Sequence, residues 1–439
     1  MKIHTTAAHC RRCNDIHPAS FVRTENRIDA IVECPDGEQV YHISSDADMY
    51  LKLRQKSVTD LTDGLSEGIR PALNFISITN ACNFNCAVCG FDAVSVHKNP
   101  VYIDVGEICR RAAAVKEIGG YFVQLFGGEP TLHPDIFEIV ERLSGTGLKV
   151  GLATNGYLMG KDKALAAKLK DKGLKRVAIQ FDSFNEEILD KFRRGYLGEK
   201  KKAVENAIEA GLDVGLNCTV TENNIHEIPD ILDYGFKLGI RVKNIALASS
   251  ASIGRFELPR NESVERERII AELVKHGERF DFSFDDIFPM PSYLPLGFSV
   301  HPDCGANIVY IRSPQETVPA NRYIDFQKLY SMLGNNRMKP NFFSRRLVPV
   351  YYILKCVRKN YLFRVLRLFA GLVFEKNKYS PLNIGITNYK AAAFLDVKRL
   401  SRCSSVFYTS VGPVKGCLHF YKDASWPGSR EFELAKGMC

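Results

Sequence analysis

Six runs with strand character alternate with helical stretches between residues 73 and 255, and this alternation constrains the fold more than any other feature. The strand-like runs are 73–79, 121–126, 148–153, 176–181, 214–220 and 242–248, and the helical stretches lie near 104–118, 135–144, 161–172, 199–210 and 225–238. Strand–helix units with short links form a parallel sheet, and right-handed crossovers wind such a sheet into a barrel. We therefore predict an α/β fold with a parallel (βα)6-type partial barrel over residues 72–255.

Polar residues and glycines follow the ends of these predicted strands. A cysteine-rich loop follows the first strand, and Gly127-Gly128-Glu129-Pro130 follows the second. The other positions are Thr154 and Asn155 after the third strand, Gln180 and Asp182 at the end of the fourth, and Asn217 within the fifth. Active sites of parallel barrels lie at the C-terminal ends of the strands. We therefore predict that these residues open onto one mouth.

The cysteine-rich loop holds Cys82, Cys86 and Cys89 at C-x3-C-x2-C spacing. Three thiolates suit three corners of a cubane 4Fe–4S cluster and leave the fourth iron without a protein ligand. Catalytic metal sites keep such an open position, whereas structural sites are normally closed. A zinc knuckle, or buried cysteines grouped by chance, is the alternative interpretation.

The cysteine loop, with the Gly127-Gly128-Glu129-Pro130 segment one strand downstream, resembles the radical SAM superfamily. The resemblance implies an iron–sulfur enzyme that binds S-adenosylmethionine (SAM) at the open iron and forms a 5′-deoxyadenosyl radical for C–H activation. It also implies that the 127–130 segment meets the amino group of the methionine part of SAM. Paired glycines suit this role because they let a backbone approach a ligand closely.

Further SAM contacts are implied by the same resemblance. Val88 would pack beside adenine, at a position where many relatives carry an aromatic residue. Thr154 and Asn155 would hydrogen-bond the carboxylate or the ribose of SAM. The remaining strand-end residues would contact the ribose or the substrate, with ordinary strand-end polarity as the alternative: Gln180, Asp182 and Asn217.

Cysteine-bearing segments outside the barrel extend the resemblance. Cys10, Cys13 and Cys34 precede the barrel, and the segments after it are His301-Pro302-Asp303-Cys304, Phe394-Leu395-Asp396, Arg402-Cys403 and Gly416-Cys417-Leu418-His419. These pieces are similar to the tetraether lipid synthase group of radical SAM enzymes. That similarity implies a small metal-knuckle domain at 1–55, a linker at 56–71, the barrel at 72–255 and a C-terminal auxiliary-cluster region at 256–439.

The N-terminal knuckle would bind zinc or iron through Cys10, Cys13 and Cys34. A tetrahedral site needs a fourth ligand, and the nearby candidates are His17, Asp36 and His42. A degenerate knuckle without metal is the alternative.

The C-terminal region would bind an auxiliary 4Fe–4S cluster that relays electrons or docks the substrate. Its four candidate ligands are Cys304, Cys403, Cys417 and Cys439. Beyond this cluster, we predict one exposed, charge-laced helix over 263–280 and no further strand–helix repeat after about residue 281.

Residues 341–376 form a basic and apolar segment. Basic side chains outnumber acidic ones there, and large aliphatic and aromatic residues fill the gaps. Basic charge interleaved at helical spacing is typical of a helix that lies in a lipid interface. The alternative is a pair of helices packed on the barrel with a solvated basic edge, and binding of nucleic acid by this segment is disfavoured by its apolar content.

The cysteine content of the chain indicates the redox state of its compartment. The 13 cysteines are an odd number, and the first residues carry no apolar run of a secretory signal. Such cysteines indicate metal ligation in a reducing compartment rather than a disulfide framework. We therefore predict a cytoplasmic protein, peripheral at the inner membrane surface in the lipid hypothesis below.

Two enzymatic hypotheses and one other follow. The first is C–H activation on hydrocarbon chains of a membrane lipid, by C–C coupling or modification. The second keeps the radical chemistry but acts by methylation, crosslinking or epimerisation on a peptide or small heterocycle. Either enzyme needs a low-potential electron donor of the flavodoxin or ferredoxin type. The third hypothesis is a non-enzymatic iron–sulfur scaffold or redox sensor.

Overall fold

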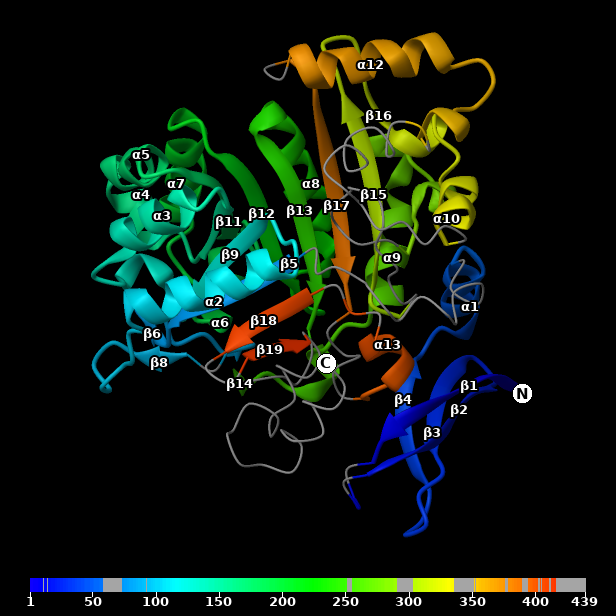
Figure 1. Cartoon of the computed structure of the whole chain (residues 1–439). Helices are drawn as coiled ribbons and strands as arrows, with labels where there is room; N and C mark the ends of the chain where they lie inside the picture. Colours follow the sequence, from blue (N-terminus) through cyan, green and yellow to red (C-terminus); the bar gives the residue numbers. More distant parts are fainter. Residues whose placement is uncertain are drawn as a thin grey trace.

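Figure 1 shows the computed structural model of the chain. The structure describes residues 1–57, 73–250, 255–289, 303–334, 351–375, 378–388, 394–409 and 412–415, apart from positions 11, 14, 92, 352, 402 and 404. The predicted cluster ligands Cys417 and Cys439, and most of the predicted linker at 56–71, lie outside these residues.

Six parallel strands form the centre of the molecule, as the sequence predicts. They are β5 (Leu73–Thr79), β9 (Phe122–Gly127), β10 (Lys149–Thr154), β11 (Leu174–Gln180), β12 (Asp213–Val220) and β13 (Val242–Ser249). Each pairs with the next one along the chain in parallel register. Every bound lies within two residues of its predicted position, because each strand is a short apolar run closed by glycine or polar residues.

Helices connect these strands and cover the outside of the sheet (Figure 1). They are α2 (Val105–Glu117), α3 (Ile136–Gly145), α4 (Tyr157–Lys161), α5 (Lys163–Asp171), α6 (Glu186–Lys191), α7 (Leu197–Glu209) and α8 (Ile228–Lys237). Asp104 starts α2 by accepting hydrogen bonds from the N–H groups of Gly106 and Glu107 at 2.8 and 3.2 Å, which is the usual role of an Asp N-cap. The short helices α4 and α6 are the two of this series that the sequence analysis did not predict.

The sheet has two unlike faces. The helix-covered face carries large aliphatic residues that form the main core, such as Leu125, Leu152, Ile179, Leu216 and Ile245. Successive residues of a strand point to opposite faces, so the inner face carries small and amide residues: Gly151, Ala153, Ala178, Gln180, Gly215, Asn217, Asn244 and Ala246. Several of them remain partly exposed. Small and amide side chains therefore line much of the inner face of the central strands.

Strands from the C-terminal part extend this sheet at both edges, so it has eleven strands within the described residues. The added strands are β15 (Gly305–Arg312), β16 (Thr317–Pro319), β17 (Ser380–Thr387), β18 (Ser405–Thr409) and β19 (Gly412–Lys415). β17 is parallel to β13, and β18 is parallel to β5. The prediction that no further strand–helix repeat follows residue 281 is therefore wrong for the sheet, since residues on both sides of the predicted boundary at 255 share it. Local patterns give no sign that a strand pairs with a partner more than 100 residues away.

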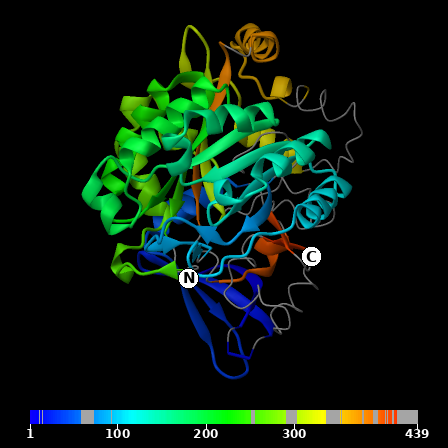
Figure 2. The same cartoon turned by 90° about the vertical axis from the view of Figure 1, so that its left-hand side faces the viewer.

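The first 57 residues form an antiparallel sheet and one helix beside the barrel (Figures 1 and 2). The strands are β1 (Lys2–His9), β2 (Ile16–Thr24), β3 (Arg27–Val32) and β4 (Gln39–Ser44), followed by α1 (Ala47–Gln55). The unit is fastened to the rest of the chain by hydrogen bonds from Ser45 to Glu265 and by pairing of Ala8 with Asp396.

Helix α9 (Arg266–Lys275) corrects the prediction of an exposed helix over 263–280. Its apolar residues Ile269, Ile270 and Leu273 are buried in the main core, and its charged residues Arg266 and Glu267 are buried as well, as an ion pair. Charged residues are rarely buried unless they are paired. The sequence pattern predicted an exposed helix because it cannot show that Arg266 and Glu267 pair with each other inside the protein instead of with water.

Helix α12 (Leu362–Phe374) lies within the basic apolar segment 341–376. One face packs Val365 and Leu368 against a second core, while Phe363 and Phe374 on the other face are 86% and 84% exposed. The helix precedes β17 and binds the loop after β15 through an Arg364–Glu316 ion pair. It therefore sits at the N-terminal ends of the parallel strands. None of the described helices is both long and apolar enough to cross a membrane.

Candidate active site

The cysteine loop lies directly after β5, at the C-terminal edge of the sheet. Its residues form the short strands β6 (Ala81–Cys82), β7 (Val88–Cys89) and β8 (Val94–Ser95), and β7 pairs with β14 (Arg255–Phe256). Cys82 and Cys86 are buried, and Cys89 is partly exposed. Burial raises the pKa of Cys82 to about 12. This thiol would therefore ionise only beside a cation such as cluster iron.

The Gly127-Gly128-Glu129-Pro130 segment pairs with the backbone that leads into this loop. The N–H of Gly128 donates to the carbonyl of Thr79 at 2.8 Å, and the N–H of Glu129 donates to the carbonyl of Ala81 at 2.6 Å. A Cβ atom on Gly128 would overlap the carbonyl oxygen of Ala81, and Gly127 has a φ of 146°. Both glycines are thus required by close backbone contact with the residues just before Cys82.

The carboxylate of Glu129 is the hub of this arrangement. It is fully buried and accepts hydrogen bonds from the N–H and hydroxyl of Thr131 at 3.1 and 2.5 Å. It also accepts from the hydroxyl of Thr154 and from the N–H of Asn155, both at 2.7 Å. Burial raises the pKa of Glu129, while these hydrogen bonds favour its ionised form.

The sequence-predicted contacts Thr154 and Asn155 therefore reach the mouth, but their donors are engaged within the protein. The side-chain amide of Asn155 also donates to Asn83 in the cysteine loop at 2.8 Å. In this arrangement both residues hold Glu129 and the cysteine loop in place. The direct hydrogen bonds to SAM that the resemblance implies for them stay a prediction.

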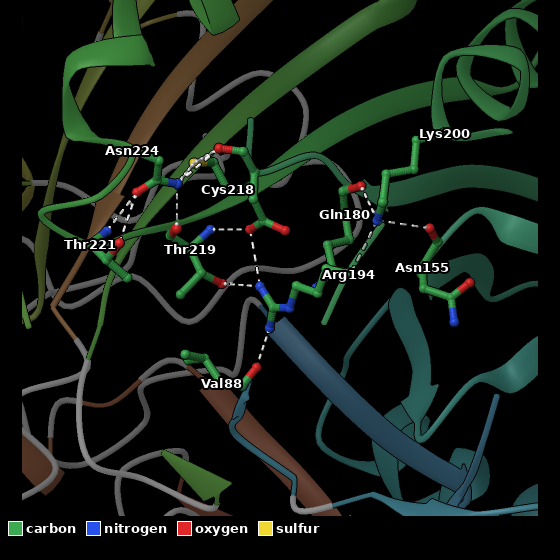
Figure 3. Close-up of polar contacts among 10 residues, drawn as sticks. Val88, Asn155, Gln180, Arg194, Lys200, Cys218, Thr219, Thr221 and Asn224 are labelled. Atoms are coloured by element: carbon green, nitrogen blue, oxygen red, sulfur yellow. Dashed lines mark hydrogen bonds and ion pairs between the residues drawn. The ribbon is translucent and has the colours of Figure 1, made fainter. Parts of the chain in front are cut away.

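A buried arginine that the sequence analysis missed ties the cysteine loop to the ends of β11 and β12. The guanidinium of Arg194 donates to the Asp182 carboxylate and to the Thr219 hydroxyl, both at 3.0 Å, and to the carbonyl of Val88 (Figure 3). Burial alone would lower the pKa of Arg194, but Asp182 and the Cys86 thiol outweigh it and raise the pKa. Arg194 therefore stays charged beside the cysteines.

The carbonyl of Val88 is consequently engaged by Arg194, and Val88 lies opposite Phe256 of β14 in the antiparallel pairing. The side chain of Val88 is buried against Phe192 and Leu258. Val88 lies in the cysteine loop, and its packing against the adenine of SAM stays a prediction.

A buried lysine, also missed by the sequence analysis, lies on the other side of the mouth. The ammonium group of Lys200 on α7 donates to the carbonyls of Asn155 and Gln180 at 3.4 Å and to the Gln180 side-chain oxygen at 3.2 Å (Figure 3). Burial lowers its pKa to about 8. Because an ammonium group only donates, Gln180 must turn its oxygen to Lys200 and its NH2 group away from it.

The titration of Lys200 predicts a pH dependence of stability. Its pKa is lowered in the folded chain, so the unfolded chain binds the proton more tightly and stability rises with pH above about 8. Between pH 7 and 9.5 the gain should be about 1 to 2 kcal/mol. Lys200→Met should remove this gain, as measured by thermal unfolding of the SAM-free holoprotein without oxygen. Equal pH profiles for wild type and variant would contradict the assignment.

Asp182 offers a test of whether this mouth suits SAM. The carboxylate is fully buried, and its Oδ1 accepts from Arg194 and from the N–H of Thr219. Its Oδ2 is buried too and has no hydrogen-bond partner among the described residues. A buried carboxylate oxygen of this kind suits a hydroxyl donor such as that of a ribose. Asn217 lies beside Gln180 on the neighbouring strand β12, as predicted, and is partly exposed on the inner face.

The three cysteines of the loop are not gathered as closely as ligands of a single ion. Among the described residues, the one group of Cys, His, Asp or Glu whose ligand atoms all lie within 4.8 Å is Cys10, Cys13 and Cys34. Three thiolates on one loop suit three corners of a cluster and leave the fourth iron open. Cys82, Cys86 and Cys89 would hold a 4Fe–4S cluster, with Asp182 and the inner face beside them for SAM. When bound, the 4Fe–4S cluster would supply the electron for reductive cleavage of SAM.

Cys10, Cys13 and Cys34 meet as the sequence predicts, at one end of the N-terminal sheet. The Sγ atoms of Cys13 and Cys34 are 3.5 Å apart, and His17 Nε2 lies 2.9 Å from Cys13 Sγ. His42, another candidate fourth ligand, instead binds Asp29 and Glu265 at 3.2 and 2.9 Å. The three thiols could bind a metal ion, and of the two histidine candidates it is His17 that stands next to them.

We expect His17→Ala to lower the zinc affinity of this triad by more than about 100-fold, the upper end of what loss of an outer-shell partner costs. The reason is that Zn²⁺ needs four ligands, and on binding the Cys13 and His17 atoms would sit about 3.6 Å apart. Competition with a chromophoric chelator measures the affinity, and His42→Ala is the matched control. An affinity unchanged in His17→Ala would exclude His17 as a ligand.

The predicted auxiliary site is described in part. Cys304 precedes β15 at the end where β15 pairs with Thr387, and Cys403 precedes β18 where β18 meets Leu73. Because Cys417 and Cys439 lie outside the described residues, the four-cysteine cluster stays a prediction.

Comparison with known proteins agrees with this geometry. Residues 76–235 match the family model described as the radical SAM superfamily. A probable GTP 3′,8-cyclase of Methanothermobacter thermautotrophicus is 31% identical over 221 residues, which cover 48% of this chain and 68% of the relative. The chain belongs to the radical SAM superfamily. It is accordingly an iron–sulfur enzyme.

Other relatives differ in how much of their length is matched. Cyclases from Methanococcus aeolicus and Methanocaldococcus jannaschii are matched over only 56% and 55% of their length. The 7,8-dihydro-6-hydroxymethylpterin dimethyltransferase of Methanocaldococcus jannaschii is 24% identical over 91% of this chain and 89% of the relative. Among solved structures, Streptococcus suis SuiB bound to S-adenosylmethionine matches 52% of this chain and 53% of its own, with a TM-score of 0.41 and 16% identity.

Proposed function

We propose that this radical SAM enzyme modifies a C–H bond of a small heterocycle that is rich in hydrogen-bond acceptors. The observation that carries the proposal is the amide-rich inner face of the sheet beside the cysteine loop. The similarity to a pterin dimethyltransferase over nearly the whole chain supports the same substrate class. A low-potential donor of the flavodoxin or ferredoxin type would supply the electron.

Two amides of the inner face, Asn244 and Gln180, have their oxygens turned toward a donor within the protein. The NH2 group of Asn383 donates to the oxygens of Asn244 and Asn307 at 2.8 and 3.0 Å, so the NH2 group of Asn244 points away from this contact. Gln180 is turned in the same sense by Lys200. The buried Nε2 of Gln124 has no hydrogen-bond partner among the described residues. Buried donors are normally satisfied, and ring nitrogens or carbonyls of a heterocycle would satisfy them.

Aromatic side chains form the other wall of the inner face. Phe75 on β5 and Phe407 on β18 stack at 4.7 Å, and Phe126 on β9 contacts both edge-on at 5.8 and 5.2 Å. Flat aromatic surfaces next to amide donors favour a planar ring. A saturated hydrocarbon chain would leave the amides without partners.

The test uses reconstituted protein with SAM, dithionite and 7,8-dihydro-6-hydroxymethylpterin. The pterin should increase 5′-deoxyadenosine formation, and its own mass should change. Gln124→Leu should lose the stimulation without loss of thermal stability, because the Nε2 it removes has no partner to lose. Gln315→Leu, at an exposed position, is the control. No stimulation by pterins or by guanine nucleotides would overturn the heterocycle proposal.

A membrane lipid is the second candidate substrate, in line with the resemblance to the tetraether lipid synthase group. The exposed Phe363 and Phe374 of α12, next to the basic Arg367, favour contact with an anionic lipid surface. However, α12 lies at the N-terminal ends of the strands, away from the cysteine loop (Figure 1), so this helix does not offer a lipid a route to the mouth. Cosedimentation with phosphatidylglycerol vesicles, lost in Phe363→Asp, would support this candidate, and absence of cosedimentation would remove it.

A further inference from the structure

Arg194 joins three parts of the site that are far apart in the sequence. It follows α6, and its guanidinium reaches the carbonyl of Val88 between two of the cysteines, the carboxylate of Asp182 after β11 and the hydroxyl of Thr219 on β12. The ion pair with Asp182 is closed to water, since the two side chains are 6% and 0% exposed. A charge pair in this position acts on the cysteine loop with little solvent screening.

We propose that Arg194 and Asp182 form a charge pair that seats the cysteine loop and sets the reduction potential of the cluster bound there. Neither residue would be a ligand of the cluster. Both act on it indirectly, through the position of the cysteine loop and through the electric field of their charges, so Arg194 is a positioning residue. The inference depends on membership of the superfamily and not on which substrate is modified.

The direction of the effect follows from charge. Reduction adds one electron, that is, one negative charge, to the cluster. A nearby cation stabilises the added charge and raises the potential, whereas a nearby anion destabilises it and lowers the potential. Arg194→Gln and Asp182→Asn should therefore shift the potential in opposite directions, and the double variant should lie between them. Loss of structure alone would not produce opposite signs.

The experiment is a redox titration of the holoprotein without SAM, followed by EPR. The cluster of the cysteine loop is identified beforehand as the one whose EPR signal changes when SAM is added to a separate sample. At a fixed potential, Arg194→Gln should lower the ratio of reduced to oxidised cluster about tenfold, which corresponds to about 59 mV for one electron. Asp182→Asn should raise the ratio. Arg194→Lys keeps the charge and should change the ratio less than Arg194→Gln does.

Arg193→Gln is the matched control, because it removes the same charge one residue away. Arg193 is exposed and pairs with Glu257 at the surface, where salt screens the charge. Its ratio should equal that of the wild type. If Arg194→Gln fails to retain a cluster, the ratios measured for Asp182→Asn and Arg194→Lys still show whether these charges change the reduction potential. Equal ratios in Arg193→Gln and Arg194→Gln, or shifts of the same sign in Arg194→Gln and Asp182→Asn, would overturn the proposal.

Discussion

Replacing Cys86 with serine is expected to reduce 5′-deoxyadenosine formation to the level seen without protein. Cys86 is buried among Cys82, Phe84 and Ala93, so neither water nor another described thiol can take its place at the cluster. Loss of one of three thiolate ligands should leave the cluster unable to assemble, and about four irons per chain should be lost. Iron and sulfide analysis, with chromatography of the nucleoside product, measures both effects.

Cys109→Ser is the matched control for this result. Cys109 lies on α2, outside the cysteine loop and partly buried against the main core. Its replacement should leave the iron content and product formation unchanged. Full iron content in Cys86→Ser together with normal product would show that the loop is not the site of SAM cleavage.

The parallel core could be predicted from the sequence because its signals are local. Each central strand is a short apolar run, and each run is followed by residues such as Gly127 or Asn155 that end it. The mouth could be predicted for the same reason, since parallel strands bring their C-terminal ends to one edge. The cysteine loop, Glu129, Asp182 and Gln180 accordingly lie where the sequence analysis expects them.

The parts that could not be predicted depend on contacts between distant segments. Nothing near residue 405 shows that β18 pairs with β5, and nothing near Arg194 shows that it reaches Val88. Lys200 did leave a signal. It shares one face of α7 with Leu197, Ala203, Val204 and Ala207 at helical spacing, and a lysine on an apolar face indicates a buried charge with a specific partner.

The second large effect is expected for Gly128→Ala. The added methyl group would overlap the carbonyl oxygen of Ala81 and crowd that of Asn80 at 2.6 Å. Both carbonyls belong to backbone, so the 127–130 segment must move away from β5. Overpacking of this kind costs typically about 1–3 kcal/mol, and more where backbone must shift. We expect a lower melting temperature and a SAM affinity reduced by about 100-fold, which corresponds to about 2.7 kcal/mol.

The displacement would reach the cysteines through a short route. The N–H of Glu129 donates to the carbonyl of Ala81, the residue before Cys82, and the carboxylate of Glu129 holds Thr154 and Asn155. Moving Gly128 therefore loosens the loop and the neighbouring strand end together. Gly145→Ala, where a Cβ atom meets nothing within 4 Å, is the control and should keep both the stability and the SAM affinity of the wild type. Calorimetric SAM binding that is equal in the two variants would show that the 127–130 segment can move without disturbing the cofactor site.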